Sequence, residues 1–215
     1  MKRPAKLPLL EIKQSLRSPR VRLGAGLKKA AQFLKNGGVV IFPTDTVYGI
    51  GCRFDDKRAV KRIYQIKRTP KSQPFPILVS NIKQVDKIVK VNNIAKELIK
   101  KYWPGGLTII LPSRHPKSRV YRGAKDLTAA AKIGIRMPNS DLTRLLIDQV
   151  QVPIIATSAN FHGQPTPNSY GELDPKLIKL VDYVIKGDCK YQQESTVVDA
   201  TVDPPKVLRH GAVKL

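Results

Sequence analysis

A buried-strand pattern that changes abruptly into a polar segment is the feature that most constrains the fold. Residues 39–42 read Val-Val-Ile-Phe, an apolar run that predicts a buried strand. A proline ends the run, and Thr-Asp-Thr at 44–46 and glycines at 49 and 51 follow. Hydroxyl and carboxylate groups at a strand end, beside glycines that allow close backbone approach, predict a site for a small polar molecule. The alternative is a turn in which Asp45 caps a helix.

The bulk composition is that of a globular protein. The chain has 215 residues, of which 41% are hydrophobic and 26% charged, and this suits one domain with a full core. The sequence contains neither an apolar run long enough to span a bilayer nor a signal-peptide pattern, so we expect a cytoplasmic protein. Cys52 and Cys189 lack metal-ligand spacing and are predicted to be free thiols in a reducing compartment.

The charge balance is strongly basic. Thirty-nine Lys and Arg against sixteen Asp and Glu give a net charge of +23, which favours polyanionic partners such as nucleotide phosphates or an RNA surface. The alternative is a solvated surface of lysines, or a basic proteome in the source organism. Residues 1–24 carry seven basic side chains against Glu11 alone and predict a flexible or loosely docked basic arm, followed by one domain over residues 25–215.

Strands and helices are predicted to alternate along the chain and then to give way to crowded strands. This order predicts an α/β fold with a mixed sheet rather than a purely parallel one. We expect helices over 27–36, ended by two glycines, over 57–66, capped by Asp56, over 82–89 and 93–102, and one capped by Ser140. The expected strands are 39–42, 76–80, 107–111, 133–136, 152–156, 183–185, 196–199 and 206–208, and residues 114–131 are expected to be loop with some helix.

Four polar segments are predicted to lie at strand ends, where ligands collect in open α/β sheets. Guanidinium groups bind phosphate oxygens bidentately and a lysine supplies a mobile charge, so a nucleoside triphosphate beside a small zwitterion fits this inventory. Each side chain also has a structural alternative: complementing a helix dipole, capping a turn, covering a sheet edge or packing in the core. The segments are 44–48, Arg136, 157–160 and 195–196, with Lys67, Arg68 and Arg209 near them.

Several functional classes lack their motifs. The sequence has no G-x-x-x-x-G-K-[ST] loop, so ATP would not be held by a Walker A motif. Its three histidines are scattered without metal-ligand spacing, which predicts no metal site made by the protein alone. Ser158 has no G-x-S-x-G context, which argues against a hydrolase nucleophile.

Seven motifs occur in an order that matches a known family. They are Phe42–Gly49, Ile66–Pro74, Pro104-Gly105 with Thr108, Ile133–Pro138, Thr157–Asn160, Ser195–Asp199 and Leu208–Gly211. Over roughly residues 27 to 213 the chain resembles the YrdC/Sua5 family of L-threonylcarbamoyladenylate synthases, in its short single-domain form. The resemblance implies a YrdC-like twisted mixed parallel/antiparallel sheet flanked by helices, with a large basic cavity.

The resemblance also implies an activity. The family is a class of nucleotidyltransferases that condense L-threonine, bicarbonate or CO₂, and ATP into threonylcarbamoyl-AMP and pyrophosphate, for the N6-threonylcarbamoyladenosine (t6A) modification of tRNA. Mg²⁺ is expected with the ATP rather than in a cage of protein ligands. RNA and the proteins that accept the threonylcarbamoyl group are further expected partners, and no membrane is.

Carried onto this sequence, the family's site residues fall into three overlapping groups. Catalytic roles go to Lys67, Arg68, Ser158 and Asn160. Threonine binding goes to Thr44, Thr46, Tyr48 and Ser158. ATP binding goes to Lys67, Arg136, Thr157, Asn160, Ser195 and Arg209.

One segment departs from the family pattern. The family usually has Lys-x-Arg-Pro, whereas this chain has Lys67-Arg68-Thr69-Pro70, which puts Thr69 in the arginine's place and Arg68 one position early. The related YciO-type proteins also vary here. The alternative function is therefore a YciO-like protein that binds double-stranded RNA or tRNA without robust synthase activity.

Overall fold

The structure is a computed structural model that describes residues 24–70, 72–114 and 132–215. The predicted basic arm, apart from Gly24, lies outside the described residues, as do residues 115–131 of the predicted loop. None of the helices within the described ranges is long and apolar enough to cross a membrane.

The predicted caps lie at helix ends, although α1 begins and ends slightly earlier than predicted and no side chain caps its start. Helix α1 (Ala25–Lys35) is followed by Gly37 with a φ of 81°, a left-handed conformation that glycine adopts without strain. Helix α2 (Lys57–Lys67) begins after Asp56, whose side chain accepts hydrogen bonds from the first free backbone N–H groups. The others are α3 (Ile82–Ile88), α4 (Asn93–Tyr102), α5 (Asp141–Val150), capped by Ser140, and α6 (Pro175–Ile178), which was not predicted.

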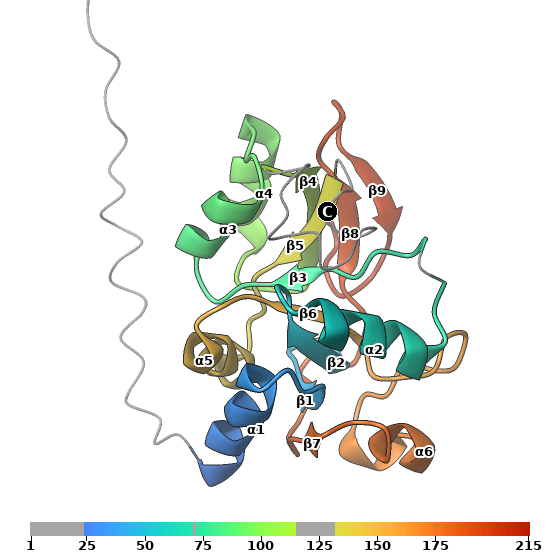
Figure 1. The fold of residues 1–215 in the computed structure, drawn as a ribbon. Coiled ribbons are helices and arrows are strands. Elements are labelled where there is room, and N and C mark those ends of the chain that lie inside the picture. The colour runs from blue at the N-terminus through green and yellow to red at the C-terminus, as the bar shows by residue number, and fades with distance from the viewer. Residues whose placement is uncertain (1–23, 71, 115–131) are drawn as a thin grey trace, which may run out of the picture.

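The described residues form a nine-stranded sheet in the order β7-β1-β2-β6-β3-β5-β4-β8-β9 (Figure 1). Strand β1 pairs in parallel with β7, β3 with β5, and β4 with β8, and the remaining neighbours are antiparallel. The predicted mixed sheet is therefore confirmed. The strands are β1 (Val40–Pro43), β2 (Tyr48–Arg53), β3 (Ile77–Leu78), β4 (Leu107–Pro112), β5 (Lys132–Arg136), β6 (Ile154–Ser158), β7 (Tyr183–Val184), β8 (Thr196–Asp199) and β9 (Lys206–Arg209).

The polar segment after β1 is a turn that joins β1 to β2 as a hairpin. The backbone N–H of Thr44 donates to the carbonyl of Val47 at 3.3 Å, and Pro43 pairs with Tyr48 across the hairpin. The alternative in which Asp45 caps a helix is wrong, because the chain returns along β1 as a second strand instead of starting a helix. The turn nevertheless keeps its hydroxyl groups at the end of the sheet.

The sheet is covered on both faces, and β1 shows how its side chains divide. Val40 and Phe42 pack in one apolar cluster with α1 and α5, whereas Val39 and Ile41 pack in a second cluster with α2. This division follows from the period of two in a strand, and it explains why β1 is apolar at every position. Figure 1 shows α1 and α5 side by side on one side of the sheet and α2 on another.

Candidate functional site

A cavity of about 580 Å³ lies over one face of the sheet, beside the β1–β2 turn, because alternate residues such as Thr108 and Ile110 of β4 and Gly134 and Arg136 of β5 line it. Its walls come from segments that are far apart in the sequence but that meet because β2, β6, β3, β5, β4 and β8 are consecutive in the sheet. Nine residues predicted for the site line it: Thr44, Thr46, Lys67, Arg136, Thr157, Ser158, Asn160, Ser195 and Arg209.

Lys67 is buried in the wall of the cavity at the end of α2. Its Nζ donates to the carbonyl oxygens of Ser158 at 2.5 Å and Asn160 at 2.6 Å, and to Oδ1 of Asn160 at 2.9 Å. Burial lowers the pKa of Lys67 to about 8, and the negative charge of Glu194 opposes this shift. The three acceptors match the three donors of an ammonium group, so the lysine fixes the Ser-x-Asn segment while it supplies a positive charge.

Arg136 anchors the β1–β2 turn from the neighbouring part of the sheet. Its guanidinium donates to the carbonyl of Gly105 at 2.9 Å, to Oγ1 of Thr46 at 2.8 Å and to the carboxylate of Asp45. The side chains of Arg136 and Asp45 are 7% and 0% exposed, and burial lowers the pKa of Arg136 while the Asp45 charge opposes the shift. Asp45 therefore compensates the buried arginine that positions the Thr46 hydroxyl.

A second network joins β4, β8 and β9 at the other side of the cavity. Ser195 Oγ lies 2.9 Å from Oγ1 of Thr108 and accepts from Nη2 of Arg209 at 3.1 Å. Nη1 of Arg209 donates to Oε2 of Glu194 at 2.6 Å, and the Thr166 hydroxyl donates to Oε1 of the same carboxylate at 3.2 Å. Sequence reasoning missed Glu194 and Thr166, although Glu194 directly precedes the predicted Ser195 segment.

Arg68 and Thr69, where the sequence departs from the family pattern, lie in different surroundings. Thr69 lines the cavity and is 8% exposed, and its hydroxyl has no hydrogen-bond partner among the described residues. Arg68 has a left-handed φ of 55° and is exposed, with its guanidinium 5.3 Å from the centre of the Phe161 ring. It does not line the cavity, so this part of the wall carries a neutral hydroxyl side chain where the family pattern has an arginine.

Tyr48 is the other predicted site residue that the structure places elsewhere. It is fully buried, donates through its hydroxyl to the carbonyl of Gly187 at 2.6 Å and accepts from the N–H of the same residue at 2.9 Å. Tyr48 is not among the residues that line the cavity. Tyr48 therefore has the structural role given above as the alternative: it packs in the core, and its hydroxyl group is hydrogen-bonded.

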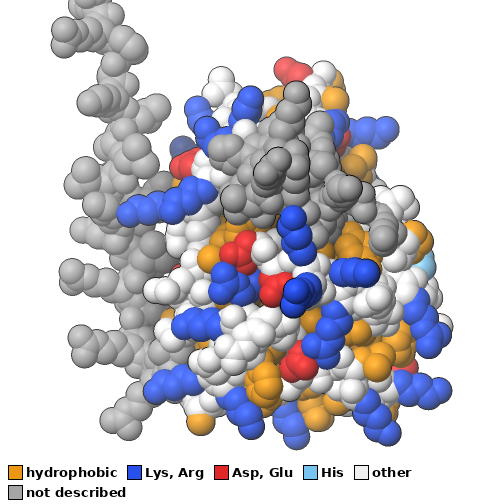
Figure 2. Space-filling view, in the orientation of Figure 1, with side chains coloured by type: hydrophobic (Ala, Val, Ile, Leu, Met, Phe, Trp, Pro, Cys, Tyr) orange, Lys and Arg blue, Asp and Glu red, His pale blue; other side chains and the backbone are white. Residues whose placement is uncertain are grey.

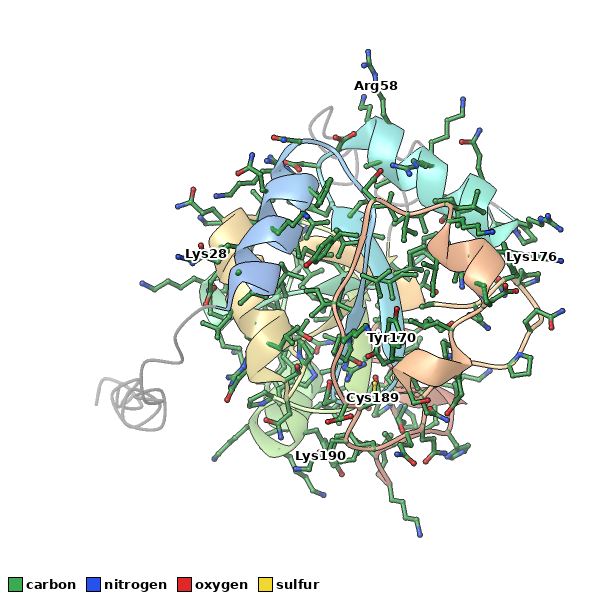
Figure 3. All side chains as sticks on the ribbon, turned by 90° about the horizontal axis from the view of Figure 1, so that it is seen from below. Lys28, Arg58, Tyr170, Lys176, Cys189 and Lys190 are labelled. Carbon is green, nitrogen blue, oxygen red and sulfur yellow. The ribbon has the colours of Figure 1, made fainter. Side chains whose placement is uncertain are left out.

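Both cysteines are free and buried, as predicted for the thiols. Burial raises the pKa of Cys189 to about 11 and also raises the pKa of Cys52. Cys189 lies in the interior beneath the loops seen in Figure 3. Since the thiolate is the reactive form, neither cysteine is suited to act as a nucleophile.

Hydroxyl, amide and cationic side chains around one cavity over the face of a mixed sheet are typical of an α/β protein that binds a small polar molecule. The chain belongs to the Sua5/YciO/YrdC family, because the family model described as "Telomere recombination" matches residues 32–211.

Three relatives show the range of this similarity. A Methanocaldococcus jannaschii protein, provisionally named threonylcarbamoyl-AMP synthase, is 38% identical over 193 residues, which cover 87% of this chain and 88% of the relative. The threonylcarbamoyl-AMP synthase of Pyrococcus abyssi is 34% identical over 209 residues, which cover 96% of this chain and 58% of the relative. Escherichia coli YciO, an uncharacterised protein, is 31% identical over 195 residues, covering 90% and 91%.

Solved structures of the last two proteins have the same fold. P. abyssi Sua5 complexed with L-threonine superposes with a TM-score of 0.75 at 35% identity, covering 86% of this chain and 54% of that one. The E. coli YciO structure superposes with a TM-score of 0.74 at 30% identity, covering 87% and 90%. The chain thus spans a little over half of the P. abyssi protein and most of YciO.

Proposed function

We propose that the chain is an L-threonylcarbamoyl-AMP synthase, which condenses L-threonine, bicarbonate or CO₂, and ATP and releases pyrophosphate. One observation carries the proposal: seven motif segments that match the synthase family supply the walls of a single cavity. The names of the M. jannaschii and P. abyssi relatives and the threonine complex of P. abyssi Sua5 support it.

The chemistry requires positive charge at this place. A carbamate formed on the threonine nitrogen is an anion, and it must attack the α-phosphorus of ATP, which is also anionic. Two like charges about 4 Å apart repel by about 4 kcal/mol at an effective dielectric constant of about 20. Lys67 and Arg209 line the cavity and offset this repulsion, whereas the charge of Arg136 is compensated by Asp45. Positioning and electrostatic stabilisation thus replace an enzyme nucleophile.

In this proposal one end of the cavity binds threonine and the other end binds the nucleotide. Thr44 and Thr46 offer hydroxyl groups to threonine at the end held by Arg136, and Ser158 lies between the two ends. Thr157, Asn160, Ser195 and Arg209 hold the nucleotide, and Lys67, whose three N–H groups bond to Ser158 and Asn160, contributes its charge. Tyr48 and Arg68 take no part through direct contact, because neither lines the cavity.

Further parts of the proposal concern the metal ion, the proteins that accept the product, RNA and the location in the cell. Mg²⁺ accompanies ATP, since magnesium in such sites is bound through phosphates and one or two carboxylates at most. The product is passed to proteins that carry out the t6A modification of tRNA. RNA binding and a cytoplasmic location are supported by the composition of the chain only.

The test is a pyrophosphate assay on purified protein. With ATP and bicarbonate, pyrophosphate release should depend on L-threonine. Lys67→Ala should reduce it at least about 100-fold, because it removes a cation of the cavity and the anchor of the Ser158–Asn160 segment, and losing one preorganised electrostatic contact to developing charge costs about that factor. Lys61→Ala is the matched control, because Lys61 is an exposed lysine on the same helix and should leave the rate unchanged.

Absence of threonine-dependent release, from protein shown to be folded, would contradict the synthase proposal. Thr69 would then be the decisive departure from the family pattern, and the YciO-like function in RNA binding would be favoured. That function predicts RNA affinity that falls steeply with salt concentration.

A further inference from the structure

Glu194 is a carboxylate in the wall of a cavity that otherwise presents cations. Besides His162, the charged residues that line the cavity within the described ranges are Lys67, Arg136, Arg209 and Glu194. The charge of Arg136 is compensated by Asp45 directly behind it. Glu194 compensates a second cation. Three cations against the carboxylates of Asp45 and Glu194 give this group a net charge of about +1 in the usual ionised forms at neutral pH.

The position of Glu194 is fixed from both ends. Its carboxylate is held by Thr166, which lies in the loop after β6, and by Arg209 in β9. Its backbone carbonyl accepts from the N–H of Ala212 at 2.8 Å. The carboxylate thus belongs to the wall of the cavity, and it sits beside the arginine proposed to bind phosphate.

Arg209 can hold a phosphate without releasing Glu194. Its hydrogen bonds to the Ser195 carbonyl, the Ser195 hydroxyl and Glu194 use three N–H groups, and a guanidinium has five. A phosphate that accepts from the remaining N–H groups would lie within about 5 Å of the Glu194 carboxylate, because both would contact one planar guanidinium group. A bare triphosphate would be repelled at this distance, whereas a divalent cation on the phosphates would turn the repulsion into attraction.

We propose that Glu194 makes the cavity selective for ATP that carries Mg²⁺, by repelling the bare triphosphate and facing the metal ion of the complex. This inference rests on the proposed function. A single carboxylate suits the role, since Mg²⁺ keeps most of its water and takes one or two carboxylates besides phosphate oxygens. Across the described residues no group of three or more His, Cys, Asp and Glu gathers into a site that would hold the ion without the nucleotide.

The experiment measures the Kd of ATP by calorimetry without threonine, once with Mg²⁺ and once with a chelator, for the full chain and for Glu194→Gln. In the unmodified protein Mg²⁺ should tighten ATP binding at least about tenfold, a factor equal to about 1.4 kcal/mol. In Glu194→Gln, ATP without Mg²⁺ should bind more tightly than to the unmodified protein, and ATP with Mg²⁺ should bind no more tightly. Glu97→Gln, an exposed residue on α4, removes the same charge and should behave as the unmodified protein.

Each other outcome overturns the inference. Weaker binding by Glu194→Gln under both conditions would mean that Glu194 only positions Arg209. Tighter binding under both would mean that it only competes with phosphate. An unchanged effect of Mg²⁺, in a protein that still releases threonine-dependent pyrophosphate, would refute the role of Glu194 and leave the proposed function intact. If the unmodified protein binds no ATP under either condition, the inference fails, and the proposed function fails with it only where threonine-dependent pyrophosphate release is also absent.

Discussion

The buried pair of Asp45 and Arg136 decides how the β1–β2 turn is held. We expect Asp45→Asn to lower the free energy of unfolding by about 3–5 kcal/mol, because it leaves the guanidinium buried without its counter-charge. Urea unfolding measures this effect. Asp55→Asn is the control, because its pair with Arg53 is 25–28% exposed and should cost about 1 kcal/mol or less. Equal losses in the two variants would contradict a special role for the buried pair.

The lowered pKa of Lys67 predicts that a rise in pH has opposite effects on activity and on stability. Its pKa is about 8 in the folded protein against an ordinary value of 10.5, so between these values the folded state binds fewer protons than the unfolded chain. Its contribution to the free energy of unfolding is therefore unfavourable below pH 8 and becomes less so as the pH rises towards 10.5. ATP affinity and turnover should instead fall above pH 8, because the ammonium charge is lost.

The check is to measure both quantities over that pH range in the unmodified protein and in Lys67→Met. The variant has no charge to lose, so its low ATP affinity should no longer fall through the titration of this residue. An affinity in the unmodified protein that stays constant from pH 7 to pH 10 would show that the charge of Lys67 does not contribute to binding.

At the residue scale, the sequence predicted which polar side chains gather but not how all of them point. Hydroxyl, amide and cationic side chains at or beside strand ends, together with Lys67 at the end of α2, were predicted to gather, and nine of these residues line the cavity. Arg68 and Tyr48 point elsewhere because of details that a pattern does not contain, a left-handed residue after α2 and a partner at Gly187. Glu194 was missed because its role depends on Arg209 and Thr166, which only the fold brings near.

At the scale of elements, β2 depends on close packing against β6. A Cβ added at Gly51 would lie 2.6 Å from the carbonyl oxygen of Ile155, whereas one added at Gly49 would have its nearest neighbour at 3.6 Å. We expect Gly51→Ala to cost about 1–3 kcal/mol of stability through overpacking, and Gly49→Ala to cost less. Denaturant unfolding of the two variants compares them within one strand, and similar losses would show that β2 moves away from β6 easily.

Strand β2 could not be predicted from its own sequence pattern. Its sequence, Tyr-Gly-Ile-Gly-Cys-Arg, has two glycines and a low strand propensity, so no strand was predicted there. The strand forms because β1 and β6 flank it and because glycine allows β6 to approach. The elements that were predicted correctly have local signals, such as Asp56 before α2 and the unbroken apolar run of β1. The short helix α6 and the 3₁₀ turn Tyr170–Glu172 lack an amphipathic pattern long enough to detect.

At the scale of the whole molecule, the excess of positive charge is spread over the surface. Figure 2 shows Lys and Arg side chains scattered over the visible face with few acidic ones among them, and Figure 3 shows Lys28, Arg58 and Lys176 extending away from three different helices. Six ion pairs join described residues, and most are partly exposed. Because the net charge of +23 already counts every carboxylate, it is an excess of cations that no acidic side chain balances. Self-repulsion should therefore oppose the compact state.

This repulsion predicts that salt stabilises the fold. Between about 0.02 M and about 0.3 M KCl the screening length falls from about 20 Å to about 6 Å, so repulsion between distant lysines is removed while the buried pair of Asp45 and Arg136 is hardly affected. The unfolding temperature should rise over this range and then level off, and potassium acetate at the same ionic strength should give the same curve. The same salt increase should weaken ATP binding, because the cations of the cavity are screened too. A falling unfolding temperature would mean that surface ion pairs outweigh the excess charge, and a rise that depends on the anion would indicate anion binding at a particular site.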